Sequence, residues 1–182
     1  MSEDLSWQNY KLHSIIPEIL KNCGWDKPTK IQAEVLPYAL EKKDIIGIAE
    51  TGSGKTGAFA LPVINDLLEE AQSFHTLILT PTRELAFQIK DTFNALGGSA
   101  NIKCGNFHLI YIKFEVVLVG GIDNVEQALA LSKSPHVIIA TPGRLIDHLE
   151  NTKGFNLKKI KYLIIDEADR ILNMDYEKEV VI

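Results

Sequence analysis

Short runs of apolar and β-branched residues alternate along the chain with stretches of helical spacing. The runs that predict strands are residues 44–49, 76–80, 114–119, 136–140 and 162–165. Each run is nearly continuous, which is typical of strands covered on both faces. The intervening stripes predict helices and include Leu85, Ile89, Phe93 and Leu96 in one stretch and Leu145, Ile146 and Leu149 in another. This order predicts an α/β fold, in which a parallel β-sheet has helices on both faces and binds ligands at the carboxyl ends of its strands.

Two helices are predicted before the first of these strands. Ser14 is a candidate N-cap for the first helix, Pro17 is tolerated in its first turn, and Gly24 is a candidate stop. Thr29 is a candidate cap for the second helix.

A glycine-rich segment follows the run 44–49 and precedes a helical stretch. Its residues are Ala49, Glu50, Thr51, Gly52, Ser53, Gly54, Lys55 and Thr56. In this context the glycines let backbone N–H groups surround an anion, and the helix N-terminus adds partial positive charge. Lys55 is expected to reach the outer phosphates of ATP, and the Thr56 hydroxyl to help hold Mg²⁺. Ala49 stands where the general phosphate-loop pattern has a glycine, and an accidental glycine-rich turn is the alternative.

The last predicted strand runs directly into Asp166, Glu167, Ala168 and Asp169. Adjacent carboxylates repel each other by about 1 kcal/mol at about 4 Å in water, a cost that a divalent cation removes. We therefore expect Asp166 to be the acid on the magnesium side, together with Thr56. Glu167 is placed to orient or deprotonate the attacking water of a phosphoryl transfer. The alternative is a solvated helix start, where acidic residues are favoured.

Composition narrows the class of protein without naming a partner. The 182 residues fit one domain, with 46% hydrophobic and 24% charged residues and a net charge of -5. That charge argues against a general nucleic-acid-coating protein but does not exclude a local binding groove. The chain shows no apolar run of the ~20 residues that span a bilayer and no secretory signal pattern. Because no run is long enough to span a bilayer, we expect no membrane partner. Because Cys23 and Cys104 lack disulfide-framework or metal-ligand spacing, we expect an intracellular protein with reduced thiols.

These residues together resemble the DEAD-box family of RNA-dependent ATPases and helicases, and the likeness covers nearly the whole chain. Residues 166–169 spell the motif that names the family, and residues 49–56 match its phosphate loop, including Ala49. The remaining matches are residues 24–32, which resemble the adenine-recognising Q motif, and residues 81–86, 120–121 and 141–144, which resemble the RNA-contacting motifs of the first of two RecA-like domains. Within the family, residues 24–32 and 139–176 look most like the nucleolar helicase of ribosomal RNA processing, so the resemblance implies a place in the nucleus and nucleolus.

The resemblance implies roles in ATP binding for Trp7, Trp25, Lys27 and Gln32. A side-chain amide such as that of Gln32 can donate to and accept from the N6/N7 edge of adenine at once, which selects ATP over GTP. Trp25 offers a stacking face for the base, and Trp7 stands in the place of the motif's upstream aromatic residue. The alternative is that these side chains only pack the junction between helices.

The resemblance also implies an RNA-binding set in the loops after the strands. Its members are Pro81, Thr82, Arg83, Gly120, Gly121, Thr141, Pro142, Gly143 and Arg144. Such loops expose N–H groups, hydroxyls and guanidinium groups, which bind a sugar-phosphate backbone and carry no base code. The expected partner is single-stranded or structured RNA, bound independently of its sequence. Without the resemblance, a turn at residues 141–143 and a local ion pair between Arg83 and Glu84 are the better interpretations.

The predicted organisation is one N-terminal RecA-like helicase domain over residues 1–182, with the Q-motif region at 1–42 and the phosphate-loop core at 43–182. The family's second RecA-like domain, which completes the ATPase site with its arginines, and its Ser-Ala-Thr motif are absent from the sequence. We therefore expect this chain to bind nucleotide, hydrolyse it weakly and unwind nothing. Residues 101–113 form an extra segment rich in β-forming residues, for which an edge strand, a hairpin and disorder all remain open.

Three other functions compete with this interpretation. A GTPase should carry an Asn-Lys-x-Asp motif that reads the base, and the sequence has none. A DNA-directed helicase leaves Gln32 and its Pro-Thr context without a reason. A non-catalytic ATP-sensing or protein-docking module suits the chain as it stands.

Overall fold

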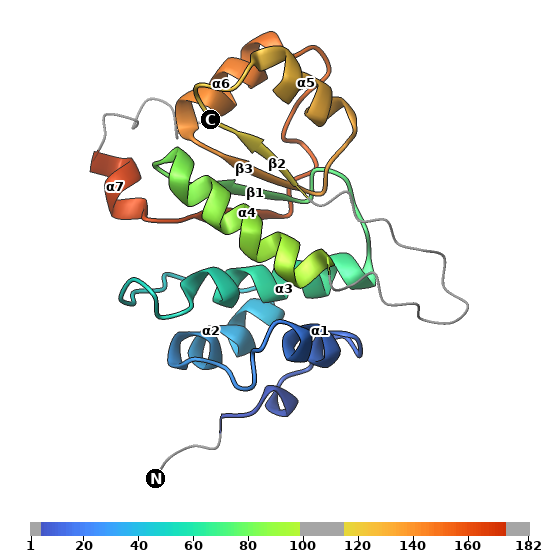
Figure 1. The fold of residues 1–182 in the computed structure, drawn as a ribbon, viewed down its shortest axis with the longest axis vertical. Helices are drawn as coiled ribbons and strands as arrows, with labels where there is room; N and C mark the ends of the chain where they lie inside the picture. The colour runs from blue at the N-terminus through green and yellow to red at the C-terminus, as the bar shows by residue number, and fades with distance from the viewer. Residues whose placement is uncertain (1–4, 99–114, 174–182) are drawn as a thin grey trace. The chain divides into compact units, whose positions relative to one another are not determined.

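The computed structural model describes residues 5–98 and 115–173, and Figure 1 shows its ribbon. The chain divides into two compact units, one within residues 1–70 and 92–110 and the other within residues 71–91 and 111–182. Helix α4 (Arg83–Gly98) contributes residues to both units. The extra segment at 101–113 lies outside the described residues, so its structure stays a prediction.

The first unit begins with the 3-10 helix η1 (Trp7–Asn9) and helix α1 (Ile16–Asn22). Pro17 lies in the first turn of α1, as predicted. Gly24 ends the helix in the left-handed conformation, with φ of 70°, which confirms the predicted stop.

The predicted cap of α1 at Ser14 is wrong. Ile15 occupies the N-cap position and makes no side-chain hydrogen bond there. The backbone of His13 caps the helix instead, because the carbonyl oxygen of His13 accepts a hydrogen bond from the N–H of Ile16 at 2.9 Å. A backbone acceptor that curls back in this way removes the need for a capping hydroxyl.

Helix α2 (Lys30–Leu40) begins at the predicted cap. Thr29 and Gln32 form a capping box, in which each side chain satisfies the backbone N–H of the other residue. Helix α3 (Lys55–Glu69) follows the phosphate loop and is buried along most of its length, as its apolar sequence indicates. Cys23 is a free thiol that donates to the backbone oxygen of Ala95 at 3.3 Å.

The predicted strand at residues 44–49 is also wrong. These residues carry no strand, and Ile46 and Ile48 are 93% and 92% exposed. A strand exists only where a neighbouring strand pairs with its N–H and C=O groups, and this segment has no such ladder partner among the described residues. The apolar runs predicted the four other strands correctly. Hydrophobicity alone does not show whether a run has a neighbouring strand to pair with.

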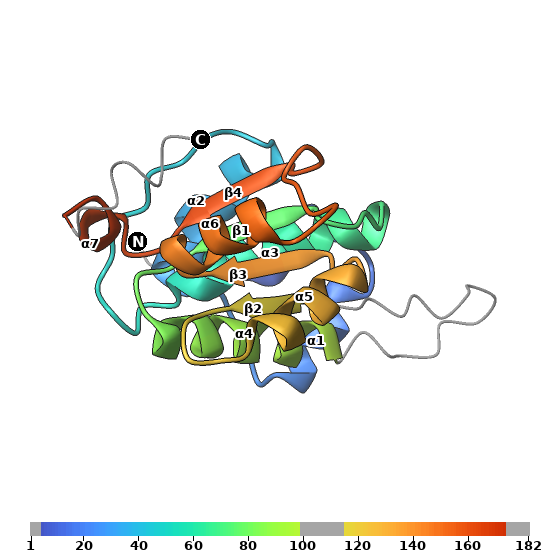
Figure 2. The same cartoon turned by 90° about the horizontal axis from the view of Figure 1, so that it is seen from above.

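The other four predicted strands form one parallel sheet in the second unit. They are β1 (Thr76–Leu79), β2 (Glu115–Leu118), β3 (Val137–Ala140) and β4 (Tyr162–Ile165), in the order β2-β3-β1-β4 (Figure 2). The register pairs Ala140 with both Leu79 and Leu118, and Leu79 with Ile165. All four strands therefore end in one row, which brings the segments that follow them to one edge of the sheet.

Helices lie on both faces of this sheet. In Figure 1, α5 (Asn124–Ser132) and α6 (Pro142–Asn151) lie on one side of the strands, and the first turns of α4 lie on the other. The core on the α5 and α6 side includes Leu118, Ile138 and Leu145, together with Ile171 of α7 (Ala168–Asn173). This arrangement confirms the predicted α/β class. None of the helices in residues 5–98 and 115–173 has the length and apolar character needed to span a bilayer.

Candidate functional site

The phosphate loop turns on two glycines in the left-handed conformation. Gly52 has a φ of 80°, and Gly54, the N-cap of α3, has a φ of 96°. A Cβ on Gly54 would also lie 2.8 Å from Thr29 Oγ1 and 2.9 Å from Gln32 Nε2. Gly54 is therefore required both for its backbone conformation and for its lack of a side chain.

The loop holds several hydrogen-bond donors that suit an anion. The first backbone N–H groups of α3 have no acceptor within the helix, and they carry its partial positive charge. The Ser53 hydroxyl is buried and has no hydrogen-bond partner in the part of the chain that the structure describes. Lys55 Nζ donates to the backbone oxygen of Ala49 at 2.6 Å, so its ammonium folds back onto the start of the loop. A phosphate group fits this donor set, because it offers anionic acceptors to both Ser53 and Lys55.

Gln32 ties the start of α2 to the phosphate loop. Its Nε2 donates to the backbone oxygen of Gly54 at 3.1 Å, and its Oε1 accepts from the N–H of Thr29 at 2.9 Å. A side-chain amide has two N–H donors and two acceptor lone pairs. One donor and one acceptor position of Gln32 therefore remain for a ligand such as the edge of a purine.

Trp25 and Gln32 fill a notch that Gly57 leaves in the first turn of α3. A Cβ on Gly57 would lie 2.7 Å from the Trp25 ring and 2.5 Å from Gln32 Nε2. Trp7 is 8% exposed, and its Nε1 donates to the backbone oxygen of Trp25 at 2.7 Å. The structure thus brings Trp7, Trp25 and Gln32 together as packing partners next to the loop. Other residues expected at the nucleotide are more open, with Thr51 and Lys27 exposed and Thr56 half-buried.

The acidic cluster follows β4 at the carboxyl edge of the sheet. Asp166 extends the strand pairing by one residue, because its N–H donates to the backbone oxygen of Leu79 at 2.9 Å. Glu167 has a φ of 49°, which is uncommon for a residue with a side chain. Its Oε2 forms an ion pair with Arg170 Nη1 at 2.8 Å.

The metal ligands expected from the sequence are one hydroxyl and one carboxylate, Thr56 and Asp166. Among residues 5–98 and 115–173, no group of three or more His, Cys, Asp or Glu side chains is arranged to hold a metal ion. Mg²⁺ usually binds through one or two carboxylates and completes its coordination with water and phosphate oxygens, so the role of Thr56 and Asp166 stays a prediction.

The expected RNA-binding residues follow β1, β2 and β3, whose aligned ends bring them to one edge of the sheet. Gly121 has a φ of 76°, and the guanidinium group of Arg83 lies where a Cβ on Gly121 would stand. Pro81 and Pro142 are buried, and Pro142 is the first residue of α6, where proline is tolerated. The Thr82 hydroxyl accepts from the N–H of Leu85 at 3.3 Å and caps α4.

Thr141, Gly143 and Arg144 open helix α6. Thr141 is its N-cap, and the Thr141 N–H donates to the backbone oxygen of Leu118 at 3.0 Å. Gly143 is exposed, so its backbone is accessible. The Arg144 side chain is 16% exposed, and its Nη1 lies 3.8 Å from Asp147 Oδ2. Arg144 Nη1 has no hydrogen bond among the described residues, which leaves a buried donor for a ligand.

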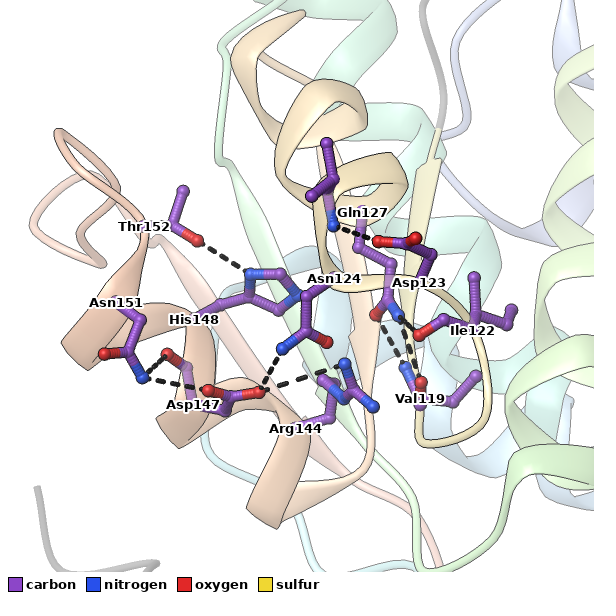
Figure 3. A network of polar contacts seen from close by, with 11 residues as sticks. Val119, Ile122, Asp123, Asn124, Gln127, Arg144, Asp147, His148, Asn151 and Thr152 are labelled. Carbon is purple, nitrogen blue, oxygen red and sulfur yellow. Dashed lines mark hydrogen bonds and ion pairs between the residues drawn. The ribbon is translucent and has the colours of Figure 1, made fainter.

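A polar network that the sequence did not predict surrounds Arg144 (Figure 3). Asp147 accepts from Asn151 Nδ2 at 2.9 Å and from Asn124 Nδ2 at 2.8 Å, and these hydrogen bonds lower the pKa of the Asp147 carboxyl. His148 is 2% exposed, and its Nδ1 pairs with Thr152 Oγ1 at 2.8 Å. Burial lowers the pKa of His148, an effect that Asp147 opposes and Arg144 reinforces.

Sequence reasoning therefore missed residues that support the site without resembling a motif. Gly57 carried a weak signal, since a glycine inside the first turns of a helix needs a packing reason. Arg170 stands three residues after Glu167, a spacing at which helical side chains meet. Gln127 lies on the apolar side of α5 and is 3% exposed, and only the fold shows which backbone groups it binds.

Comparisons with known proteins agree with this geometry. The chain is 57% identical over 180 residues to the Probable ATP-dependent RNA helicase DDX47 of Bos taurus, covering 99% of this chain and 37% of that protein. It is 54% identical to the ATP-dependent rRNA helicase rrp3 of Neosartorya fischeri, covering 93% of this chain and 34% of that protein. The chain thus spans about a third of the length of these curated relatives.

Solved structures show the same fold at lower identity. The RNA-helicase Prp28 from Chaetomium thermophilum bound to ADP matches with a TM-score of 0.80 and 36% identity, over 96% of this chain and 41% of that one. A DEAD box protein from Methanococcus jannaschii matches with a TM-score of 0.81 and 38% identity, over 97% of this chain and 45% of that one. Residues 29–181 match the family described as DEAD/DEAH box helicase, and the chain belongs to this family.

Proposed function

We propose that this chain is the ATP- and Mg²⁺-binding N-terminal RecA-like domain, residues 1–182, of an RNA-dependent ATPase that remodels or unwinds RNA. The observation that carries the proposal is the phosphate loop, where the left-handed Gly54 begins α3 and accepts a hydrogen bond from Gln32. The Gln32 side chain can therefore contact the base of a nucleotide while it bonds the loop that holds the phosphates of that nucleotide. The relatives named rRNA helicases support a role in ribosomal RNA processing, and with it a nuclear and nucleolar location.

The residues divide the work of phosphoryl transfer between binding and positioning. Residues 51–56 would hold the phosphates through backbone N–H groups and the Lys55 ammonium, with Trp7, Trp25, Lys27 and Gln32 on the base side. Thr56 and Asp166 would hold Mg²⁺, which neutralises phosphate charge when bound. Glu167 would orient or deprotonate the attacking water. Pro81 to Arg83, Gly120 to Gly121 and Thr141 to Arg144 would hold the RNA backbone independently of base sequence.

A polypeptide that joins a second RecA-like domain to these 182 residues would complete the ATPase site. The 182-residue chain is therefore expected to bind ATP, hydrolyse it weakly and leave duplexes intact. Unwinding of an RNA duplex by this chain alone would contradict the proposal.

Parallel titrations with ATP and GTP, in the presence of Mg²⁺, test the nucleotide site. ATP should bind more tightly, since Gln32 retains one donor and one acceptor for the adenine edge. Lys55→Ala should weaken ATP binding by about tenfold to a hundredfold, because it removes a charged hydrogen-bond donor. Lys21→Ala is the matched control, since Lys21 is exposed in the last turn of α1 and lies outside the residues proposed to bind the nucleotide. Equal affinity for the two nucleotides would exclude the adenine-reading role of Gln32.

RNA-stimulated phosphate release tests the enzymatic part of the proposal. A protein that also contains the second RecA-like domain should release phosphate from ATP faster when single-stranded RNA is added. Release that does not respond to RNA would favour an ATP-sensing module over a helicase.

A further inference from the structure

The loop after β2 is closed by the side chain of one residue, Gln127 of α5 (Figure 3). Its Oε1 accepts from the N–H of Val119 at 3.0 Å, and its Nε2 donates to the backbone oxygens of Val119 and Ile122, each at 3.1 Å. Three of the four hydrogen-bonding positions of the amide are thus spent on backbone groups on either side of Gly120 and Gly121. Gln127 is 3% exposed, so these bonds do not compete with water.

The backbone between Val119 and Ile122, which Gln127 holds at both ends, consists of two glycines and is otherwise flexible. Gly120 and Gly121 carry no side chains, and glycine loses more backbone conformational entropy on being fixed than any other residue. Gly121 is exposed, and the position of a Cβ on Gly120 has open space around it. The backbone groups of this turn are therefore open to a ligand, while their conformation is set from behind by Gln127.

Arg83 depends on the shape of the same turn. Its guanidinium group occupies the space beside Gly121 where a side chain would stand, and Gly121 has a φ of 76°. A shift of the turn would therefore move the surface against which the Arg83 guanidinium lies.

A second connection runs from α5 to α6. Asn124 Nδ2 donates to Asp147 Oδ2 at 2.8 Å, and the same oxygen lies 3.8 Å from Arg144 Nη1. Asn151 Nδ2 holds the other carboxylate oxygen, Oδ1, at 2.9 Å. The carboxylate of Asp147 is thereby held between Asn124, the first residue of α5, and the guanidinium of Arg144.

We propose that Gln127 is a positioning residue for the RNA backbone, which holds the Gly120–Gly121 turn in its binding conformation beside Arg83, with Asn124 and Asp147 extending the same restraint to Arg144. This inference rests on the proposed function, because it assigns a support to the RNA contacts of that function. Gln127 touches no RNA in this scheme. It lowers the entropy that RNA binding would otherwise lose in ordering the turn.

The test is an NMR titration of the isotope-labelled chain with single-stranded oligouridine, followed at the amides of Gly120 and Gly121, with an ATP titration of each variant alongside. Gln127→Met keeps the length of the side chain and removes all three hydrogen bonds. It should weaken RNA binding by about tenfold and speed amide hydrogen exchange at the turn, with ATP affinity unchanged. Gln72→Met is the matched control, since Gln72 bonds the backbone oxygen of Lys159 at 2.5 Å before the start of β1. It should leave RNA binding as it is.

Gln127→Glu separates positioning from a general loss of packing. Its carboxyl group still accepts from Val119, and when protonated it regains one donor for a backbone oxygen. The RNA affinity of this variant relative to the parent should therefore improve as pH falls, whereas that of Gln127→Met should not. If Gln127→Met does not fold, Asn124→Ala tests the exposed half of the network and should weaken RNA binding in the same direction.

The outcomes distinguish this inference from the proposed function. A parent chain that binds no RNA overturns the RNA-binding function itself. A parent chain that binds RNA, with Gln127→Met binding equally well and showing unchanged exchange at Gly120 and Gly121, overturns the positioning role alone.

Discussion

Gly57 shows how a single missing side chain can organise the nucleotide side of this molecule. The Trp25 ring and the Gln32 amide occupy the space next to its backbone, and Gln32 reaches Gly54 from that position. Neither residue could lie there if α3 carried a methyl group at position 57. The identity of this residue therefore controls whether the base-side residues reach the phosphate loop.

Gly57→Ala should accordingly separate Gln32 from the loop. The new Cβ would lie 2.5 Å from Gln32 Nε2, closer than any relaxed contact, so the side chain must move. We expect a loss of about 1–3 kcal/mol in the free energy of unfolding, measured by denaturant titration. ATP affinity should fall as well, and ATP should lose its advantage over GTP.

Gly47→Ala is the control for this change, because a Cβ at that position would meet Ile31 Cδ1 at an ordinary distance of 3.9 Å. It should alter neither nucleotide preference nor stability by a comparable amount. Unchanged ATP binding in Gly57→Ala would show that the space beside Gly57 is not needed for nucleotide binding.

The burial of His148 should make the stability of the protein depend on pH. The folded state holds its pKa below the unfolded value of about 6.5, so the unfolded chain binds more protons at mildly acidic pH. The free energy of unfolding should therefore fall as pH drops below about 6.5 and stop responding to His148 once pH is below its folded pKa.

Unfolding titrations of the parent and of His148→Gln at neutral and mildly acidic pH measure this effect. The variant should lose the part of the slope that begins near pH 6.5, while the contribution of Asp147, whose folded pKa is lowered, falls away only at more acidic pH. An identical slope in both proteins would assign the dependence to other groups.

At the scale of elements, the start of α2 has two functions. The capping box of Thr29 and Gln32 stabilises the helix, and the same Gln32 side chain bonds the phosphate loop. Thr29 also faces Gly54, whose Cβ position lies 2.8 Å from Thr29 Oγ1. Loss of the cap should therefore reach the nucleotide site through Gln32.

Thr29→Ala should cost about 1 kcal/mol of stability and also weaken ATP binding. Asp123→Ala is a matched control, because Asp123 caps α5 by accepting from the N–H of Val125 at 2.7 Å. It should cost a similar amount of stability and leave ATP affinity unchanged. Parallel thermal unfolding and nucleotide titration of both variants make the comparison, and equal ATP affinities would contradict the coupling.

At the scale of the whole molecule, the parallel register of the sheet gathers the loops that follow β1, β2, β3 and β4 at one edge. The proposed RNA contacts and the acidic cluster come from these loops. Glu167 stands at this edge in a left-handed conformation and pairs with Arg170. The ion pair with Arg170 restrains the Glu167 carboxylate at this edge.

Glu167→Gln tests that role in a protein that also contains the second RecA-like domain. The variant should bind ATP as the parent does and lose about 10²- to 10⁴-fold in RNA-stimulated turnover, because an amide cannot accept the proton of water. Steady-state phosphate release together with ATP titration measures the two effects. Glu150→Gln, at an exposed position of α6, should change neither. Normal turnover in Glu167→Gln would take the base role away from this residue.

Whatever depends on neighbours along the chain could be predicted from the sequence. The stop of α1 at Gly24, the Thr29 cap of α2 and the glycine-rich turn before α3 follow from local conformational preference and from short-range order. Motif spacing identified the family in the same way, because the chemistry of phosphate binding restricts residues that are close in sequence.

Only the tertiary structure decided which groups meet across long separations. The apolar run at 44–49 carries no strand, since pairing requires a partner that hydrophobicity does not specify. The notch at Gly57, the Gln127 bonds behind Gly120 and Gly121, and the hold of Asp147 on Asn124 likewise depend on elements brought together by the fold. Gln32 and Gln127 are buried as well, so water does not compete for their bonds, and burial is a property of the folded chain.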